Sequence, residues 1–331
     1  MKAMHLTSPH VIESSPLLLT DTVIPTPDED EILLNISACG ICHTDLHVIE
    51  GELSPKKLPL IPGHQVVGTV EKVGSRVKNF SIGNRAGVAW LHWTCGDCGY
   101  CKRGKENLCP HAKFTGYDVD GGYAEYMVVP ADFAYSIPKQ LTDEEAAPLL
   151  CAGIIGYRAL RLSEIKPGQR LGLFGFGASA HIAIQVAKYW NCEVFVFSRS
   201  VHHQKLAEQL GATWTGTAEE IPSHRLQSAI IFAPAGELVP KALRTLDKGG
   251  ILALAGIHMT PIPSLDYSLL YHERTIRSVA NSTRQDGVEF LKLAAEIPIR
   301  TEVEVFPLRE ANRSLQLLKA GKIRGAGVLQ V

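Results

Sequence analysis

The sequence lacks the segments that mark secreted or membrane-spanning proteins. Its N-terminus has no apolar core of a signal peptide. Its longest apolar run, residues 146–157, is interrupted by Pro148 and is shorter than the roughly 20 residues that cross a bilayer. The chain has no block of like charge, and its net charge of -1 offers no attraction for nucleic acid or an anionic membrane. We therefore expect a cytoplasmic protein whose partners are small molecules, not nucleic acids or membranes.

Eight cysteines in a chain without a secretion signal favour metal ligands or reactive thiols over disulfides. Four of them lie in one short loop as C-x2-C-x2-C-x7-C: Cys95, Cys98, Cys101 and Cys109. Four thiolates so close together suit a closed tetrahedral zinc site, and the metal would order a loop that has few apolar residues. An iron–sulfur cluster and redox thiol chemistry are the alternatives. The last gap is too long for the first, and the second usually needs only two thiols.

The segment 39–47 concentrates reactive side chains, because it holds two thiols, two imidazoles, a hydroxyl and a carboxylate. It follows the alternating run Glu31–Ile36, which predicts a half-buried strand. Cys42, His64 and Cys151 would together form a set of two sulfurs and one imidazole. Three protein ligands of this kind, with a fourth position open, are typical of a catalytic zinc.

Two kinds of pattern divide the chain, and 331 residues are enough for two domains. Residues 1–150 contain short β-like runs between turns, a spacing typical of an antiparallel barrel. These runs include 66–74, 83–90 and 121–130. From residue 169, apolar strands alternate with helical patterns, which predicts a parallel sheet with helices on both faces. The strands are expected at 170–174, 193–197, 228–232, 250–255 and 275–279, with helices at 179–190, 202–210, 237–246, 287–296 and 309–320.

A glycine-rich turn joins the first strand of this second part to its helix. The sequence Gly175-Phe176-Gly177-Ala178-Ser179-Ala180 has the form G-x-G-x-x-A. The first glycine permits a tight turn, the second lets a pyrophosphate approach the backbone, and the small sixth residue lets helix and strand pack closely. A plain strand-to-helix turn is the alternative, but the position between a strand and a helix favours dinucleotide binding.

The end of the next strand bears on which dinucleotide is bound. An acidic residue is expected about 20 residues after the glycine loop in proteins that bind the ribose hydroxyls of NAD. Here Ser198 and Arg199 follow the strand, and an arginine can pair with the 2′-phosphate of NADP. The sequence therefore favours NADP, with NAD as the alternative if Arg199 is only a solvated charge.

Together these motifs resemble those of zinc-dependent alcohol dehydrogenases in the medium-chain dehydrogenase/reductase superfamily. The resemblance covers residues 40–47, Gly63-His64, the four-cysteine loop and the glycine loop. It implies an α/β fold with a GroES-like β-barrel catalytic domain and a Rossmann doubly wound parallel sheet. The implied boundaries are 1–152 for the catalytic domain, with a structural zinc lobe at about 91–112, then 153–285 for the Rossmann cofactor-binding domain and 286–331 for the return to the catalytic domain.

The resemblance also implies roles for single residues. It assigns Cys42 rather than Cys39 as a ligand of the catalytic zinc, together with His64 and Cys151. The other implied roles are Thr44 at the substrate oxygen, His47 in passing the proton to solvent, Asp45 behind the metal ligands, His43 at the cofactor pyrophosphate and Trp90 in the substrate pocket.

Two positions depart from the family pattern. Gln65 follows the zinc-ligand histidine where the family usually has glutamate, so a negative charge near the metal is missing. Ala326 stands where an arginine often meets the cofactor pyrophosphate. Arg324, two residues earlier, is a candidate substitute if both lie on one side of a strand.

We therefore expect two zinc ions per chain and reversible hydride transfer between an alcohol and NADP or NAD, giving an aldehyde or ketone. A cinnamyl-alcohol-type aldehyde reductase is the first alternative. A zinc- and nucleotide-binding protein with weak or no catalysis is the second. The resemblance implies a homodimer or homotetramer.

Overall fold

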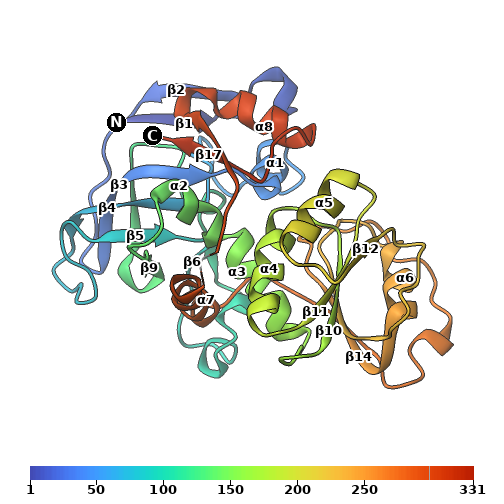
Figure 1. Ribbon diagram of the computed structural model, residues 1–331. Helices are drawn as coiled ribbons and strands as arrows, with labels where there is room; N and C mark the ends of the chain where they lie inside the picture. The colour runs from blue at the N-terminus through green and yellow to red at the C-terminus, as the bar shows by residue number, and fades with distance from the viewer. Residues whose placement is uncertain (298) are drawn as a thin grey trace. The chain divides into compact units, whose positions relative to one another are not determined.

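The structure is a computed structural model that describes residues 1–297 and 299–331. The chain forms two compact units (Figure 1). Unit 1 consists of Met1–Cys151, Thr283–Glu296 and Arg300–Val331. Unit 2 consists of Ala152–Ser282 with Ile297 and Ile299. Over the described part of the chain, no helix combines the length and the apolar character that crossing a membrane requires.

Strand β3 (Glu31–Gly40) is the central strand of the main sheet of unit 1. Its apolar side chains, such as Ile32 and Leu34, are fully buried. It pairs antiparallel with β4 (Gln65–Val73), β8 (Tyr126–Pro130) and the C-terminal β17 (Ala326–Gln330). The strand order is β16-β17-β3-β4-β5-β9, completed by β16 (Val303–Pro307), β5 (Arg85–Val88) and β9 (Ala134–Ser136). The last strand of the chain thus supports the strand that leads into the 39–47 segment.

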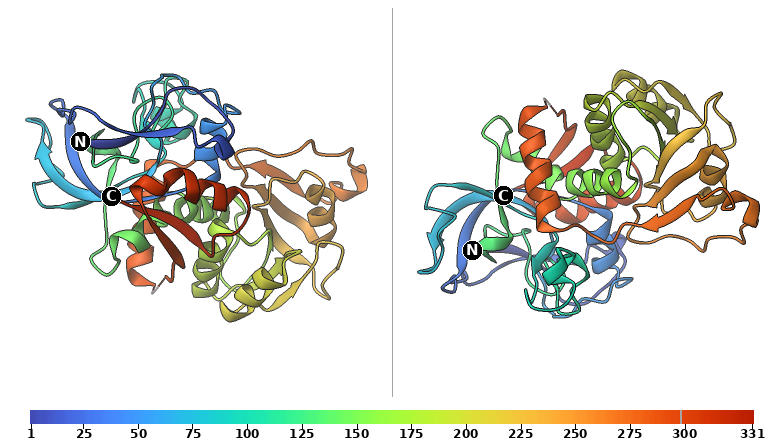
Figure 2. Two further views of the ribbon diagram at one scale, coloured as in Figure 1. Left: turned by 90° about the horizontal axis from the view of Figure 1, so that it is seen from above. Right: turned by 90° about the horizontal axis from the view of Figure 1, so that it is seen from below.

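Two small sheets and short helices complete unit 1. Strand β1 (Lys2–Leu6) pairs with β2 (Leu17–Asp21), and β6 (Leu91–Trp93) pairs with β7 (Lys113–Phe114). The α-helices are α1 (His43–Ile49), α2 (Asp143–Ala146), α7 (Arg284–Glu296) and α8 (Ala311–Lys319). The 3-10 helices are η1 (Ile12–Ser14), η2 (Cys101–Arg103), η3 (Glu106–Leu108), η4 (Ala131–Phe133), η5 (Ala147–Leu150) and η7 (Leu308–Glu310). Helix α8, in red, lies beside the blue N-terminal segment, where Asn312 donates a hydrogen bond to the carbonyl of Leu17 at 2.8 Å (Figure 2).

Unit 2 is built on a six-stranded parallel sheet. The strand order is β12-β11-β10-β13-β14-β15, which is 3-2-1-4-5-6 in chain order. This is the order of the doubly wound dinucleotide-binding fold, whose ligands bind where the direction of winding reverses, next to the first strand. The strands are β10 (Arg170–Phe174), β11 (Glu193–Phe197), β12 (Trp214–Gly216), β13 (Leu226–Ile231), β14 (Leu246–Leu254) and β15 (Thr275–Ser278).

Helices cover both faces of this sheet. Helices α3 (Ala152–Leu162), α4 (Ala178–Tyr189) and α5 (Val201–Gln209) lie on one face, and α6 (Leu238–Thr245) lies on the other (Figure 1). A 3-10 helix, η6 (Tyr267–Leu269), precedes the last strand. The expected β–α alternation from residue 169 is therefore confirmed.

Most elements expected from sequence lie within a few residues of their observed bounds, and β10 and β11 match them. The strand expected at 121–130 is shorter, because β8 begins only at Tyr126. Residues 121–123 instead form backbone hydrogen bonds with residues 61–63. Strand β12 was missed because its three residues carry almost no periodic signal.

Candidate active site

Cys42 begins the helix that carries most of the expected catalytic residues. It follows β3 in an extended conformation and is the N-cap of α1. Its Sγ accepts a hydrogen bond from the Thr44 N–H at 3.5 Å, and the Asp45 carboxylate accepts one from the Cys42 N–H at 2.8 Å. This is a capping box with a thiol in place of a hydroxyl. The local sequence therefore fixes where the Cys42 sulfur points.

The structure brings the three expected ligands of the catalytic metal together. Cys42 lies before α1, His64 immediately before β4, and Cys151 immediately after η5. Their ligand atoms all lie within 4.8 Å of one another, and the two sulfurs are 4.0 Å apart. Two sulfurs bound to one tetrahedral zinc at about 2.3 Å each would be about 3.8 Å apart. The donor set and its spacing therefore fit zinc.

The electrostatics of this cluster favour a thiolate beside a charged imidazole. Hydrogen bonding from Cys151 is the main cause that lowers the pKa of Cys42 well below its ordinary value. The same contact, with burial, raises the pKa of Cys151. Burial would lower the pKa of His64, but Asp45 and Cys42 outweigh it and raise that pKa to about 10. The pocket thus concentrates negative charge, which a divalent cation would neutralise.

Asp45 connects two of these ligands. Its Oδ1 lies 2.9 Å from His64 Nδ1, and its Oδ2 accepts the hydrogen bond from the Cys42 N–H. Asp45 and His64 are 2% and 1% exposed, so this contact is shielded from water. A carboxylate in this position fixes the ring orientation and leaves Nε2 available for a metal. The role expected for Asp45 therefore has a geometric basis.

The other residues of α1 lie close to the cluster. The Thr44 hydroxyl is 3.7 Å from the Cys42 sulfur and is largely buried. His47 lies one turn further along the helix and is partly exposed. Its Nδ1 contacts the carboxylate of Glu52, a partner that the sequence analysis missed. His43, the first residue of the helix, is exposed.

Trp90 belongs to a group of aromatic rings beside the cluster. Its ring meets His64 edge-on, with a centroid separation of 5.0 Å. It also stacks on Phe114 at 5.3 Å and on Tyr117 at 5.8 Å. Phe114 and Tyr117 were not identified from sequence, because aromatic residues outside any motif carry no local signal. The site therefore has an aromatic wall, made of Trp90, Phe114 and Tyr117.

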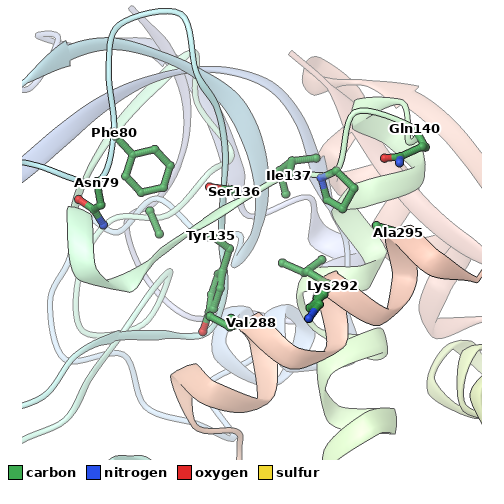
Figure 3. A pocket seen from close by; sticks show the side chains of 12 residues that line it. Asn79, Phe80, Tyr135, Ser136, Ile137, Gln140, Val288, Lys292 and Ala295 are labelled. Atoms are coloured by element: carbon green, nitrogen blue, oxygen red, sulfur yellow. The ribbon is translucent and has the colours of Figure 1, made fainter.

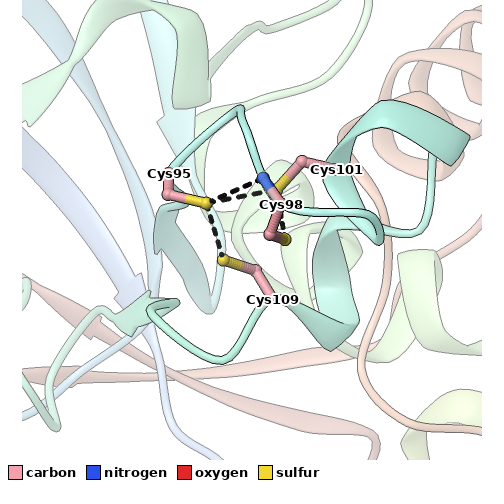
Figure 4. Close-up of side chains that lie close together, drawn as sticks. All are labelled: Cys95, Cys98, Cys101 and Cys109. Carbon is pink, nitrogen blue, oxygen red and sulfur yellow. Dashed lines mark hydrogen bonds between the residues drawn. The ribbon is translucent and has the colours of Figure 1, made fainter.

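The four-cysteine lobe forms a second cluster of ligands within unit 1. Figure 4 shows the four thiols turned toward one another. Cys95 and Cys109 are 3.5 Å apart, as are Cys98 and Cys101, and all four sulfurs lie within 4.8 Å of one another. Backbone N–H groups of Asp97 and Cys98 are the main causes that lower the pKa of Cys95 to about 6. Four sulfurs at this spacing fit a closed tetrahedral zinc site.

The glycine loop lies in unit 2, between β10 and α4. Gly175 has a φ of +85°, and a Cβ there would lie 3.0 Å from Ala233, so the turn needs glycine. Gly177 is the N-cap of α4, and space is open where its Cβ would be. The first turn of α4 consists of Ala178, Ser179 and Ala180. The N–H groups of a first turn have no partner within the helix and point outward from its N-terminal end. The loop lies beside the point where the winding reverses.

Ser198 and Arg199 follow β11 in the same unit. The Ser198 hydroxyl accepts a hydrogen bond from the Ser200 N–H at 3.2 Å, and Ser198 is largely buried. Arg199 is exposed. Ser200, which the sequence analysis did not single out, is the N-cap of α5. A phosphate approaching this turn would therefore meet hydroxyl groups and a cation, and no carboxylate from residues 198–200.

The structure corrects one expectation and refines another. Arg324 does not share a strand with Ala326, because β17 begins at Ala326 and Gly325 has a φ of +73°. The guanidinium of Arg324 pairs with Glu302 at 2.7 Å, so alternation along a strand gives no reason to aim it at a cofactor. Gln65 is 3% exposed and packs against Gly40 in the neighbouring strand. The glutamine that replaces the usual glutamate of the family is therefore buried.

Comparison with known proteins identifies the family. Residues 28–139 match "Alcohol dehydrogenase GroES-like domain", and residues 180–296 match "Zinc-binding dehydrogenase". A "Probable alcohol dehydrogenase AdhA" of Mycobacterium tuberculosis (strain CDC 1551 / Oshkosh) is 50% identical over 337 residues, covering 100% of this chain and 97% of that protein. A cinnamyl alcohol dehydrogenase of Sorghum bicolor superposes with a TM-score of 0.90 at 28% identity, covering 99% of this chain and 97% of that one. A CAD from Helicobacter pylori, complexed with NADP(H), superposes with a TM-score of 0.88 at 26% identity and the same coverage.

These comparisons confirm the expected fold class, a GroES-like domain combined with a Rossmann-type parallel sheet. They also confirm that the protein is an oxidoreductase and that its activity is that of an alcohol dehydrogenase. Since the relative from Mycobacterium tuberculosis matches along the whole chain, the assignment does not depend on fold alone. The chain belongs to the zinc-binding alcohol dehydrogenases of the medium-chain dehydrogenase/reductase superfamily.

Proposed function

We propose that this alcohol dehydrogenase binds two zinc ions per chain, prefers NADP over NAD, and uses Thr44 and His47 as its proton relay. The observation that carries the proposal is the convergence of Cys42, His64 and Cys151 beside the Thr44 hydroxyl. The four-cysteine lobe would hold the second zinc, with a purely structural role because four protein ligands leave no open position. A bound catalytic zinc acts as a Lewis acid that lowers the pKa of the alcohol.

The residues of α1 then handle the proton. The Thr44 hydroxyl accepts the proton of the alcohol and passes its own toward His47. His47 is partly exposed, so its ring delivers the proton to water. Glu52 orients this ring through the contact at Nδ1. Asp45 keeps His64 in the orientation that a metal ligand needs.

A bound nicotinamide cofactor would supply the acceptor for the hydride of the carbinol carbon, so that the alcohol becomes an aldehyde or ketone. Gly175, Gly177 and the first turn of α4 would hold its pyrophosphate, with His43 as a further contact. Ser198 and Arg199 would hold the 2′-phosphate, and NADP(H) in the Helicobacter pylori relative supports this choice. Without a carboxylate at this strand end, nothing in residues 198–200 repels that phosphate.

Steady-state kinetics of the zinc-loaded enzyme with NADP and with NAD would test the proposal. We expect a higher kcat/KM with NADP over a panel of alcohols. Thr44→Val removes the hydroxyl at nearly constant shape, so kcat should fall about 100-fold or more. Thr20→Val, at an exposed position in β2, serves as the control. Protein that holds both zinc ions but shows no turnover would favour the non-catalytic alternative, and faster turnover with NAD would remove the 2′-phosphate assignment.

The aromatic wall favours a second candidate function, which is reduction of aromatic aldehydes of the cinnamyl type. Trp90 beside His64 and the two rings stacked on it are partly exposed, and an aromatic substrate would gain about 1 kcal/mol from each ring contact that it makes. Benzyl alcohol and cyclohexylmethanol have the same carbon number but differ in the ring. Preference for benzyl alcohol that falls several-fold in Tyr117→Leu would support this candidate, and an unchanged ratio would contradict it.

The expected homodimer or homotetramer and the cytoplasmic location stay predictions. Strand β15 pairs with β14 on one side, and Tyr267 and Tyr271 nearby in sequence are 72% and 65% exposed. An edge strand with exposed rings next to it suits association with a second copy. Light scattering at the mass of a single chain would contradict this. None of the eight cysteines forms a disulfide, which agrees with a reducing compartment.

A further inference from the structure

Tyr123 is a large, fully buried side chain that contacts Asp45, the carboxylate behind the expected metal ligands. Its ring is 0% exposed, and its hydroxyl donates a hydrogen bond to Asp45 Oδ2 at 3.1 Å. The same oxygen accepts the Cys42 N–H at 2.8 Å, while the other oxygen of Asp45 faces His64 Nδ1 at 2.9 Å. The phenol is thus joined to the expected zinc ligand through one carboxylate.

This arrangement decides which oxygen of Asp45 serves which partner. Two donors, the Cys42 N–H and the Tyr123 hydroxyl, hold Oδ2, so Oδ1 is left for the imidazole. A carboxylate can only accept, so His64 must donate from Nδ1. The exchangeable position is then Nε2, whose lone pair binds a metal once the second ring proton has left. Without the phenol, one oxygen of a buried charge would lose a donor, and the carboxylate could rotate more freely.

The backbone around Tyr123 is built to admit its ring. Gly63, directly before His64, has a φ of +97°, and a Cβ there would lie 2.3 Å from Tyr123 Cδ1. A Cβ on Gly121 would lie 2.0 Å from the Gly63 carbonyl oxygen, and a Cβ on Gly122 would lie 2.3 Å from Val66. Three glycines are therefore required for the ring and the metal-ligand turn to pack together, which is independent of the hydrogen bond.

Backbone hydrogen bonds fix the same contact. The N–H groups of residues 121, 122 and 123 donate to the carbonyls of Ile61, Gly63 and Pro62, at 2.7, 2.9 and 3.0 Å. The segment that carries the phenol is thus tied to the segment that carries His64. Burial, and then the charge of Asp45, raise the pKa of Tyr123 well above its ordinary value, so the phenol stays a donor at any physiological pH.

We infer that Tyr123 is a positioning residue for the catalytic metal: its hydroxyl holds Asp45 so that His64 presents Nε2 to zinc, and this slows loss of the ion. The inference rests on the proposed function, in which Cys42, His64 and Cys151 bind that zinc. The sequence analysis missed Tyr123, because the Gly-Gly-Tyr run was interpreted only as part of a strand. Asp45 and Tyr123 are 78 positions apart in the chain.

Zinc release from the loaded, full-length Tyr123→Phe enzyme tests the inference. The variant removes one oxygen atom and keeps the ring that Gly63 accommodates. A colorimetric chelator at fixed pH reports release in two phases, and the phase of the catalytic zinc is identified by its absence in Cys151→Ser. We expect this phase to be about 10-fold faster in Tyr123→Phe, at the lower end of the effect that residues supporting the metal ligands have on metal affinity. The phase from the four-cysteine lobe should not change, which makes it an internal control for folding.

Tyr135→Phe is the matched control variant. Tyr135 is also buried and lies in unit 1, but it lines a separate cavity of about 410 Å³ against α7 (Figure 3). Both zinc phases of this variant should match those of the unchanged enzyme. A second readout is the visible spectrum of enzyme with cobalt in the catalytic site. Its ligand-field bands should shift in Tyr123→Phe and stay in place in Tyr135→Phe, because they report the orientation of the ligands and not overall stability.

The possible results separate the inference from the proposed function. An unchanged catalytic phase and cobalt spectrum in Tyr123→Phe, or equal acceleration of both phases, overturn the inference. In either case, continued oxidation of alcohols by the unchanged enzyme leaves the proposed function intact. If the unchanged enzyme shows no phase that Cys151→Ser removes, the proposed ligand set is wrong and the inference falls with it.

Discussion

Replacing Asp45 with asparagine should weaken binding of the catalytic zinc without changing the shape of the site. All three observed partners of the Asp45 carboxylate are donors: the Cys42 N–H, the Tyr123 hydroxyl and His64 Nδ1. Asparagine offers only one acceptor oxygen. If that oxygen faces Cys42 and Tyr123, its NH₂ group faces His64, so Nδ1 must accept and Nε2 carries the proton. A protonated Nε2 cannot bind a metal.

The opposite orientation of the amide is also unfavourable. The NH₂ group then faces the Cys42 N–H. Both groups can only donate, so this hydrogen bond cannot form. Asp45 is 2% exposed, so water cannot relieve the conflict. Loss of a hydrogen bond to a buried charged group costs about 1.5–3 kcal/mol. With a factor of ten per 1.4 kcal/mol, zinc affinity should fall about 10- to 150-fold, in agreement with the usual effect of removing the hydrogen-bond partner of a metal-ligating histidine.

The assay is zinc content per chain after equilibration against a graded series of chelator concentrations. Asp45→Asn should lose one zinc at a chelator concentration about 10- to 150-fold lower than the unchanged enzyme requires. It should keep the zinc of the four-cysteine lobe. Asp286→Asn is the matched control, since Asp286 in α7 is also fully buried and accepts hydrogen bonds from the N–H and the hydroxyl of Thr283, just before the helix. Asp45→Asn that keeps both zinc ions with unchanged affinity would refute the argument from donors and acceptors.

Three further predictions follow from other residues. Ser198→Asp should shift the ratio of kcat/KM values for NADP and NAD toward NAD by about tenfold or more, because the new carboxylate repels a 2′-phosphate near Arg199; an unchanged ratio would contradict the cofactor assignment. Gln65→Glu places a carboxylate next to a metal ligand and should slow zinc release several-fold, because an added negative charge attracts the cation; equal zinc retention and turnover would rule this out. Burial, and then Lys113, lower the pKa of His92 to about 4, so the folded state binds fewer protons than the unfolded state below about pH 6.5. The stability that neutral His92 contributes is therefore complete above about pH 6.5 and is lost as pH falls toward 4. His92→Phe should make the midpoint of unfolding less sensitive to acid in that range. An equal sensitivity in the variant and the unchanged protein would be evidence against a buried neutral ring.

The sequence by itself determined the features that are encoded over short distances. The four-cysteine loop needs only the spacing of residues 95–109, so its sulfurs converge as soon as the loop closes. The glycine loop between β10 and α4 follows from the chemistry of successive residues, and the alternation of strands and helices in unit 2 is a local pattern. Family resemblance added the roles of Thr44 and His47, which no pattern of spacing provides and which remain to be tested.

Only the tertiary structure decided the contacts between residues far apart in the chain. Tyr123 meets Asp45 because the Gly-Gly-Tyr segment is bonded to residues 61–63, and local periodicity cannot predict such a pairing. Phe114 and Tyr117 join Trp90 for the same reason. At Arg324, the expectation of a continuous strand was wrong because Gly325 takes a left-handed conformation and breaks the alternation. Side-chain patterns specify how a segment folds along its own axis, whereas the packing of distant segments specifies which side chains meet.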